Sequence, residues 1–275
     1  MKLTTKIILS IFGSIFFITF LFIIGFSFSE ERRNYRTFHF NAISIPQDNK
    51  IGINLASPYH VIVLEDEKTE TQAGYALTFA SNDSDLNVCS IGTEEEDKLF
   101  VPEAMYGFIS VKTDNDTLTI KIKKEELRKK YEEEDRKYIV LSGVHLYLHT
   151  SHVDVINHMS GIQTKVINME TDTIKIYSTG NILIDSCKAN VIDPVTRNSL
   201  SVTNSTVKVI NLDFNRISRW SITDCDIETK NMTGSDRHHI TLHRSETGKI
   251  NWYPKNEKAE LNIKVPGDTT QIVYR

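Results

Sequence analysis

Cysteine, glycine and proline are all scarce in this chain, and each scarcity excludes a class of protein. The 275 residues include 3 cysteines, 12 glycines and 6 prolines. Three cysteines are too few for a disulfide scaffold, and so little glycine and proline excludes collagen-like and low-complexity chains. A basic excess is missing as well, because 32 Lys and Arg residues stand against 36 Asp and Glu, a formal net charge of −4. We therefore expect no nucleic-acid partner.

Sequence motifs that mark catalytic, phosphate or zinc sites are also missing. The chain has no Gly-rich phosphate loop, no G-x-S-x-G elbow, no H-E-x-x-H helix and no Cys-x-x-Cys pair. A local metal site built from His145, His149 and His152 is conceivable, because imidazole binds zinc and copper. Exposed histidines without a metal are far commoner. The sequence predicts no enzyme, no catalytic residue, no cofactor and no metal ion.

One long hydrophobic run is present near the N-terminus. Lys6 and Glu30 enclose 23 uncharged residues, enough for a helix that crosses a ~30 Å hydrocarbon core at ~1.5 Å per residue. Residues 1–29 are therefore expected to be a membrane anchor, with residues 7–29 in the membrane. A cleaved signal peptide is the alternative, although the apolar stretch is longer than signal peptides usually have.

Basic residues flank this hydrophobic run on both sides, so the positive-inside rule does not decide its orientation. A single N-terminal span ahead of a β-rich domain most often exports that domain. We expect a protein anchored in the cytoplasmic membrane with most of its chain outside the cytoplasm. The three apparently unpaired cysteines favour the opposite orientation, in which the chain would be a regulatory domain facing the cytoplasm.

A short pattern of apolar residues recurs six times between residues 146 and 250. Counting the first apolar residue of a copy as position 0, the pattern places apolar residues at positions 0, 2, 7 and 9. Three slots depart from it, at Thr229, Thr247 and Lys249. The copies begin at Leu146, Ile167, Ile182, Leu200, Trp220 and Ile240. A repeat of about 20 residues made of strand-like units is typical of stacked solenoids.

The spacing within each copy predicts two short strands that meet at a corner. Positions 0 and 2 share a face, and so do positions 7 and 9, but the parity changes between the two pairs. The chain must therefore turn between them. If each copy forms one rung, rungs about 4.8 Å apart bury a continuous apolar column. We predict an all-β fold, a single-stranded β-helix-like solenoid with short strands and corners, with an antiparallel sandwich as the alternative.

Position 5 of each copy is also predicted to point inward, just inside the corner, where space is limited. Its occupants are mostly small residues, namely Ser151, Asp172, Cys187, Ser205, Cys225 and Ser245. In this register Cys187 and Cys225 stand two rungs apart, roughly 9–10 Å, which is beyond the reach of a disulfide. We therefore expect both thiols to be free and buried.

The rest of the chain suggests a tether followed by one β-domain. Residues 30–50 are expected to be a polar tether, and residues 51–275 the solenoid domain. Strand-like stretches without a firm register precede the repeat, at 51–56, 59–66, 75–80, 86–90, 108–112 and 117–123. Two further strands, 261–265 and 271–274, are expected to cap the last copy, because Lys, Glu and Pro protect an open sheet edge.

A dense mixed-charge run, residues 123–137, is expected to be an insertion into this domain. Its apolar members Leu127 and Tyr131 are four residues apart and would form one narrow stripe on a helix. A solvated helix or long hairpin is the simpler interpretation, and a partner-docking element is the alternative. The run is nearly charge-balanced, so it does not favour anionic membranes.

Carboxylates are frequent on the predicted outer face of the rungs. A surface patch could form there from Asp185, Asp224, Asp226 and Arg244. Solenoid polysaccharide lyases and hydrolases use carboxylates and basic residues on one outer face, but a carboxylate pair needs a defined separation that the sequence does not give. Charges that keep the outer face soluble are the simpler interpretation.

Four segments carry a family resemblance. They are VIVLEDE, DNDTLTIKIK, ILIDSCKANVI and LSVTNSTVKVIN. Over about Phe38 to Val265 the chain resembles the GIN-domain family of Bacteroidota, known as autotransporter-adhesin heads. It differs in having few glycines after the strands and in the charged run 123–137. The resemblance implies a β-solenoid of the bacterial cell envelope with an adhesion or scaffolding role, and it carries over no catalytic residue.

The sequence therefore predicts a membrane-anchored, extracytoplasmic β-solenoid that serves as a binding, adhesion or envelope scaffold module without catalysis. The expected partners are the membrane, through residues 7–29, and a protein or glycan ligand on the solenoid face. Two alternatives stay open. One is a carbohydrate-active enzyme with its site on one solenoid face, and the other is a membrane-tethered regulatory domain that faces the cytoplasm.

Overall fold

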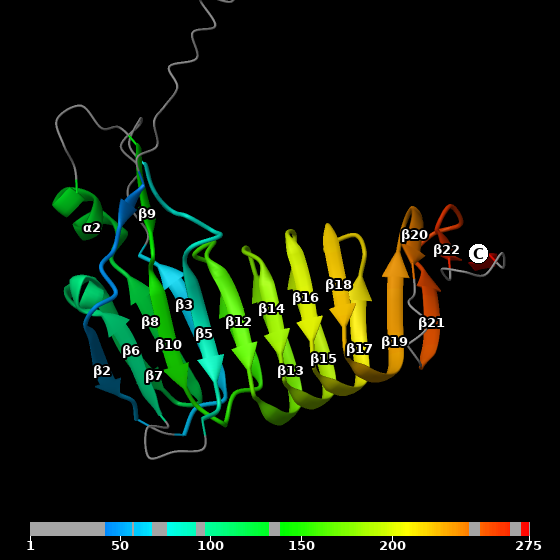
Figure 1. The fold of residues 1–275 in the computed structure, drawn as a ribbon, viewed down its shortest axis with the longest axis horizontal. Helices are drawn as coiled ribbons and strands as arrows, with labels where there is room; N and C mark the ends of the chain where they lie inside the picture. The colour runs from blue at the N-terminus through cyan, green and yellow to red at the C-terminus, as the bar shows by residue number, and fades with distance from the viewer. Residues whose placement is uncertain are drawn as a thin grey trace, which may run out of the picture. The chain divides into compact units, whose positions relative to one another are not determined.

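The computed structural model describes residues 42–56, 58–67, 76–91, 97–131, 138–241, 248–264 and 271–274. These residues belong to one compact unit, Ala42–Arg275, built predominantly of β-strands (Figure 1). The folded region begins before the expected boundary at residue 51, because Ile45 is only 1% exposed and belongs to the core. The hydrophobic run lies outside the described residues, and none of the described helices is long and apolar enough to cross a membrane.

The first large sheet contains eight strands in the order β18-β16-β14-β12-β5-β10-β6-β2. All neighbours from β18 to β10 pair in parallel, whereas β6 pairs antiparallel with both β10 and β2. Their bounds are β2 Lys50–Asn54, β5 Asp85–Cys89, β6 Lys98–Pro102, β10 His145–His149, β12 Gln163–Ile167, β14 Ile182–Asp185, β16 Ser199–Thr203 and β18 Arg219–Thr223.

The second large sheet contains nine strands in the order β21-β19-β17-β15-β13-β11-β3-β8-β7. All of its neighbours pair in parallel except β7 and β8. Their bounds are β3 Val61–Asp66, β7 Ile109–Asp114, β8 Thr117–Ile122, β11 Val155–His158, β13 Glu170–Ser178, β15 Lys188–Thr196, β17 Thr206–Asp213, β19 Asp226–Gly234 and β21 Lys249–Pro254.

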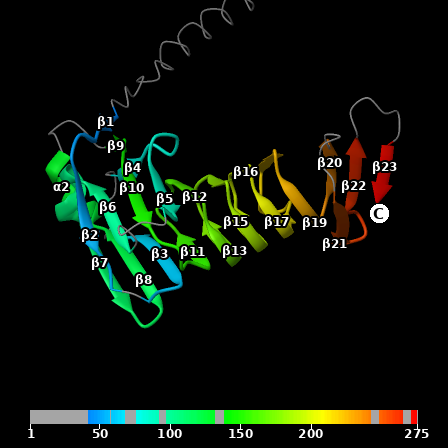
Figure 2. The same ribbon diagram turned by 60° about the horizontal axis from the view of Figure 1, so that its bottom comes forward.

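Two three-stranded sheets complete the β structure. One has the order β1-β9-β4 and the other β20-β22-β23, and Figure 2 shows the last three strands beside one another. Their bounds are β1 Ile43–Ser44, β4 Ala76–Phe79, β9 Tyr138–Ser142, β20 Arg237–Thr241, β22 Glu260–Lys264 and β23 Gln271–Tyr274. The six strand-like stretches expected before the repeat all contain strands, and so do the two expected after it. Strands β1, β6, β9 and β21 were not expected.

The charged run 123–137 forms a helix in its described part, α2, Lys124–Tyr131. Leu127 is fully buried and Tyr131 packs against the core, which confirms the predicted apolar stripe. Among the ion pairs of the helix, the shortest place Lys124 Nζ 2.6 Å from Asp66 Oδ2 and Arg128 Nη2 2.6 Å from Glu125 Oε1. A 3₁₀ helix, η1 Glu103–Phe108, is the other helix among the described residues.

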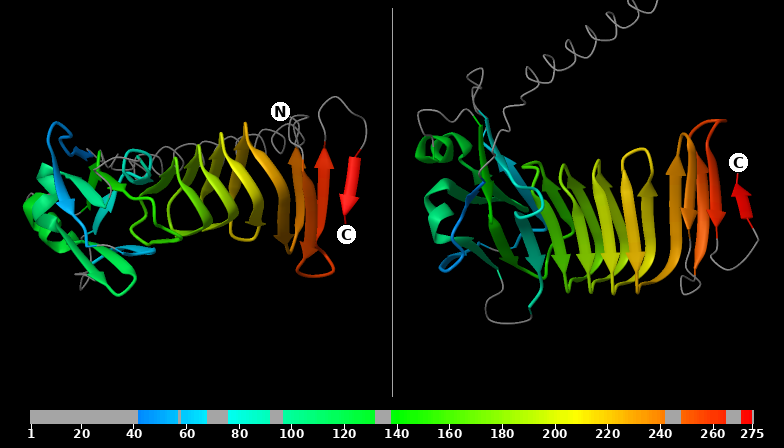
Figure 3. Two further views of the ribbon diagram at one scale, coloured as in Figure 1. Left: turned by 90° about the horizontal axis from the view of Figure 1, so that it is seen from below. Right: turned by 45° about the horizontal axis from the view of Figure 1, so that its top comes forward.

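From β12 to β19 the chain alternates between the two large sheets, and each strand after β12 pairs with its counterpart one rung earlier (Figure 3). Ile182, Leu200 and Trp220 are register partners at position 0. In these rungs positions 0, 2 and 7 face the core as predicted, and their residues are buried except for the half-buried Thr171 and Trp220. Rows of equivalent β-branched and aliphatic side chains therefore form the apolar interior.

The second copy of the pattern does not begin at Ile167. Thr164 is the register partner of Ile182, and Val166 of Ile184, so this copy begins at Thr164. Thr164 is buried, and its hydroxyl group lies against another buried polar side chain, His158. A search for apolar residues cannot detect a polar residue in the core, so the prediction missed this start. The shift also moves the corner position from Asp172, which is exposed, to the buried Met169.

Three further predictions of the repeat are wrong. The first and second copies are not neighbours in the first large sheet, because β5 lies between β10 and β12. Position 9 is not the inward one either. The pairing between neighbouring strands skips the residue at position 8. Ile192 and Ile210, at position 10, are therefore buried instead of the residues at position 9. The first strand of the last copy, β20, belongs to a separate sheet, where Ile240 pairs with Ile263, whereas Lys249, at position 9, pairs with Thr229 in the second large sheet.

The corner of each rung is formed by a residue in the left-handed region. The four are Asn168, Ser186, Asn204 and Asp224, with φ between 49° and 55°. Asn and Asp tolerate this conformation better than other residues that carry a Cβ. Ser186 is therefore the least suitable residue of the set.

Replacing Ser186 with asparagine should stabilise the fold by about 0.5 kcal/mol, because asparagine adopts positive φ at lower cost. The measurement is the urea midpoint of the full chain in detergent. The reverse change at the equivalent exposed residue, Asn168→Ser, should lower the midpoint. Shifts of the same sign in both variants would contradict this explanation.

Position 5 carries side chains that bind backbone groups inside the corner. The Cys187 backbone N–H donates to Ser205 Oγ at 3.0 Å, and Ser205 Oγ donates to Thr203 O at 2.7 Å. The three cysteines are free, as predicted for Cys187 and Cys225; Cys187 is buried, but Cys225 only partly so. Burial raises the pKa of the Cys187 thiol to about 11, so the thiol stays protonated.

Replacing Ser205 with alanine should cost about 1–3 kcal/mol, because the buried Cys187 N–H loses its acceptor. Ser205→Cys is the matched control. One rung earlier, the Cys187 sulfur already interacts with the Met169 backbone, so a sulfur at residue 205 should keep most of the stability. The urea midpoints of the two variants test this, and equal losses would contradict it.

Candidate functional site

A groove of about 400 Å³ lies along the second large sheet, where the strands bend. The bend occurs at position 8, whose residues the ladder between neighbouring strands skips. These residues are Asp172, Asn190, Lys208 and Glu228. The groove crosses β13, β15, β17 and β19, which are successive neighbours in the sheet (Figure 1). A ligand in the groove would therefore contact residues of four rungs.

Two columns of polar side chains border the groove, one at position 6 and one at position 8. Position 6 contributes Glu170, Lys188, Thr206 and Asp226, and position 8 contributes Asp172, Asn190, Lys208 and Glu228. Small or apolar residues at position 7, Thr171, Ala189 and Val207, lie between the columns. The four carboxylates and two lysines leave a formal excess of two negative charges, and the described lining contains no aromatic residue.

The two ends of the groove differ in how their charges are paired. At the β13 end, Lys188 Nζ donates to Glu170 Oε1 at 2.6 Å, and the Asn190 amide donates to Asp172. At the β19 end, the side chains of Lys208, Asp226 and Glu228 make no hydrogen bond or ion pair with other described residues. Exposed pairs such as Lys188–Glu170 contribute at most about 1 kcal/mol. The β19 end thus offers carboxylates that a ligand can bind without first breaking a contact with another described residue.

The three described residues of the sequence-predicted patch have different surroundings. Asp185 accepts hydrogen bonds from Thr203 Oγ1 at 2.6 Å and Asn204 Nδ2 at 2.9 Å, which hold the pKa of its carboxyl below the ordinary value. Asp224 is exposed at a corner, and Asp226 lines the groove. Arg244 lies outside the described residues. A common site for the four residues stays a prediction.

The sequence did not identify the position-8 column of the groove. The pattern treated this position as an unremarkable step between two inward slots, and the wrong start at Ile167 hid Asp172 by placing it inside a corner. A usable signal was present, because a polar or charged residue stands at position 8 in four successive rungs. Side chains at equivalent positions of stacked rungs point outward in the same direction when the rungs are in register.

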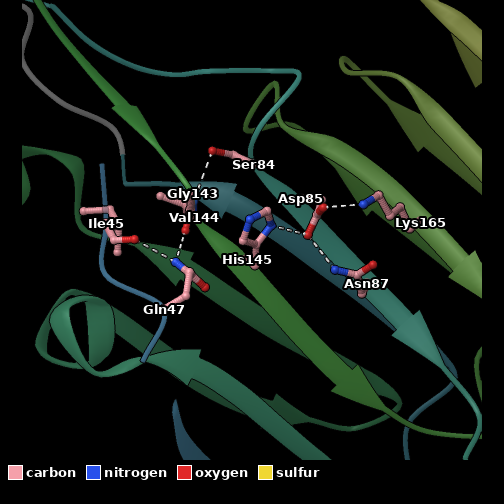
Figure 4. A network of polar contacts seen from close by, with 9 residues as sticks. All are labelled: Ile45, Gln47, Ser84, Asp85, Asn87, Gly143, Val144, His145 and Lys165. Carbon is pink, nitrogen blue, oxygen red and sulfur yellow. Dashed lines mark hydrogen bonds and ion pairs between the residues drawn. The ribbon is translucent and has the colours of Figure 1, made fainter. Parts of the chain in front are cut away.

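A second cluster of polar side chains links β5 to its neighbours in the sheet, β10 and β12 (Figure 4). Asp85 is only 3% exposed, and three side chains surround its carboxylate. Asn87 Nδ2 lies 2.5 Å from Oδ1, His145 Nδ1 lies 2.9 Å from Oδ1, and Lys165 Nζ lies 2.6 Å from Oδ2. His145 belongs to β10 and Lys165 to β12, so the buried carboxylate links the three strands. A buried carboxylate needs such partners.

The histidines once considered for a metal site have separate partners. His145 lies on Asp85, the His149 ring packs 4.8 Å from the Phe100 ring, and His152 Nε2 lies 3.3 Å from Ser151 Oγ. Across the described ranges, no group of three or more His, Cys, Asp or Glu side chains is arranged to hold a metal ion.

Comparison with known proteins finds similar solved structures at low identity. No family model and no curated protein matches the chain. A "putative adhesin" from Bacteroides fragilis is 13% identical, with a TM-score of 0.46, over 82% of this chain and 97% of that one. A "putative lipid binding protein" from Parabacteroides distasonis is also 13% identical, with a TM-score of 0.41, over 82% and 98%.

A "putative cell adhesion protein" from Clostridium sporogenes is 9% identical, with a TM-score of 0.23, over 79% of this chain and 99% of that one. Likenesses of this strength do not establish a ligand or a family. The function of this chain is therefore argued from its own residues.

Proposed function

We propose that the protein is a β-solenoid that binds a ligand in the outer groove and serves as an adhesion or envelope scaffold module without catalysis. The groove on four successive parallel strands carries this proposal. Its side chains project from a ladder whose opposite side is a buried apolar column, so the backbone that presents them is fixed before a ligand arrives. Such preorganisation lowers the entropic cost of binding.

Membrane anchoring through residues 7–29 and export of the solenoid are part of the same proposal. Their support is the uncharged run between Lys6 and Glu30. Protease treatment of spheroplasts should digest the domain while a cytoplasmic marker survives. A domain that stays protected until the membrane is opened would overturn export and favour the cytoplasm-facing regulatory alternative.

Binding is tested with the detergent-solubilised full chain and isolated envelope material of the source bacterium, namely sacculi, envelope polysaccharide and outer-membrane vesicles. We expect saturable binding to at least one of them. Thr206→Trp places a bulky ring in the groove at an exposed residue, and binding should weaken at least 10-fold. Thr223→Trp, at an exposed threonine of β18, is the matched control and should bind normally. Failure to bind any fraction would overturn the proposal.

A carbohydrate-active enzyme is the second candidate, favoured by the four carboxylates around one groove. Glycosidases use two carboxyl groups about 5–9.5 Å apart. The described lining lacks Trp, Tyr and Phe, whose apolar rings often line ligand sites. The binding experiment separates the candidates, because new reducing ends or unsaturated sugars released from envelope polysaccharide would favour the enzyme.

A further inference from the structure

At the β19 end of the groove, two carboxylates have no hydrogen bond or ion pair with other described residues. Asp226 and Glu228 border this end on either side of position 7, and Val207 lies between the two columns on the neighbouring strand. Neither carboxylate has a described partner, in contrast to Glu170 and Asp172 at the other end. A cation that reaches these two carboxylates displaces no hydrogen bond or ion pair made by the described residues.

Asp226 and Glu228 fit the charged head of a basic side chain. Val207 and Ala189 line the groove but are only 1% and 5% exposed, so the ligand side chain would be held through its head. Carboxylates bind guanidinium and ammonium groups with charge-assisted hydrogen bonds. The formal excess of two negative charges in the groove disfavours an anionic ligand.

The length of the groove suits an extended chain. Four parallel strands about 4.8 Å apart span roughly 15–20 Å, the reach of five or six extended residues at about 3.3–3.6 Å each. Sugar rings usually find aromatic faces in their sites, and the described lining has none. A polypeptide segment therefore fits better than a polysaccharide.

We propose that the groove binds an extended basic polypeptide segment, with one lysine or arginine side chain between Asp226 and Glu228. The inference rests on the proposed function of the groove and names the ligand class for it. Lys208 opposes this ligand. Its neighbours Val207 and Val209 are register partners of Ile227 and Thr229, so Lys208 stands beside Glu228 and weakens the negative potential there.

The test measures fluorescence anisotropy of labelled 12-residue peptides with the full chain in detergent, at about 20 and 150 mM salt. One peptide alternates Lys with Ser, and its counterpart alternates Glu with Ser. The Lys peptide should bind, and more weakly at the higher salt because exposed charges are screened. Asp226→Asn and Glu228→Gln should each weaken binding roughly 2- to 5-fold, the range expected for exposed ion pairs.

Lys208→Gln should strengthen binding of the Lys peptide by a similar factor. Glu257→Gln, an exposed carboxylate outside the groove, is the charge-matched control and should leave affinity unchanged. Equal binding of the Glu peptide, or no response to the two carboxylate variants, would overturn the inference. A chitosan oligomer that binds in place of the Lys peptide would overturn the polypeptide class in favour of an amino-polysaccharide.

Failure of this inference is distinguishable from failure of the proposed function. If the Lys peptide does not bind but envelope material still binds and Thr206→Trp still weakens it, only the ligand class is overturned. If neither the peptide nor any envelope fraction binds, the binding function of the groove is overturned as well.

Discussion

Replacing Gly180 with alanine is expected to destabilise the fold by about 3 kcal/mol or more. A Cβ at this residue would lie 2.0 Å from the Ile162 carbonyl oxygen and 2.8 Å from its carbonyl carbon. Both are backbone atoms of the segment leading into β12, so no side-chain rotation can relieve the overlap. The backbone at Gly180 is also held, because its N–H donates to Ser178 Oγ and its carbonyl accepts from Thr196 Oγ1.

The urea midpoint of the full chain in detergent measures this effect, with two other glycines as controls. A Cβ at Gly107 would have no atom within 4 Å, so Gly107→Ala should change stability by no more than about 0.5 kcal/mol. A Cβ at Gly161 is equally free, but φ is +80° there, and alanine should cost roughly 1–2 kcal/mol. A Gly180→Ala protein as stable as Gly107→Ala would contradict the close approach.

Acidification from pH 7 to pH 4 is expected to remove about 3 kcal/mol of stability through His158 alone. This side chain is fully buried at the end of β11. Nδ1 lies 2.6 Å from Thr164 Oγ1, and Nε2 lies 2.5 Å from Ser160 Oγ. Burial disfavours the charged imidazolium and lowers the pKa of His158 from 6.5 to about 4.

The sign follows from proton binding in the two states. The folded state keeps His158 neutral down to about pH 4, whereas the unfolded chain protonates it below about pH 6.5. The stability of the folded state is therefore undiminished above pH 6.5. It falls by up to about 1.4 kcal/mol per pH unit as the pH drops towards 4, and the loss through this group then stops.

The measurement compares urea unfolding of the wild type and His158→Gln between pH 7.5 and pH 4. Glutamine keeps a polar amide at this residue but cannot titrate, so the variant should lose less stability on acidification than the wild type. His239→Gln, at an exposed histidine of β20, should behave like the wild type. Parallel pH profiles for wild type and His158→Gln would show that His158 does not cause the acid sensitivity.

Local periodicity was enough to predict the regular rungs. The copies at Ile182 and Leu200 have apolar residues wherever the structure has an inward slot at positions 0, 2 and 7, so the predicted and observed positions agree. It failed at Thr164, where the inward residue is polar and its partner, His158, lies in the preceding rung. Hydrogen bonding between rungs leaves no apolar signal.

Pairings between distant segments could not be predicted either. Strand β5 was expected, but nothing in residues 85–89 indicates that it lies between β10 and β12, because the contacts that place Asp85 come from His145 and Lys165. The groove was missed in part for a related reason. Asp226 was recognised as an outer carboxylate, whereas the bend that brings position 8 into the lining is visible only in the ladder between strands.

The position of β5 also constrains the order in which the chain can fold. Residues 85–89 pair with residues 145–149 on one side and 163–167 on the other, so the first large sheet stays incomplete until the chain has been synthesised well past residue 160. Each later strand needs only the strand one rung earlier. Long loops are slow to close. The step that joins β5 to both neighbours should therefore limit the folding rate, with the later rungs added quickly behind it.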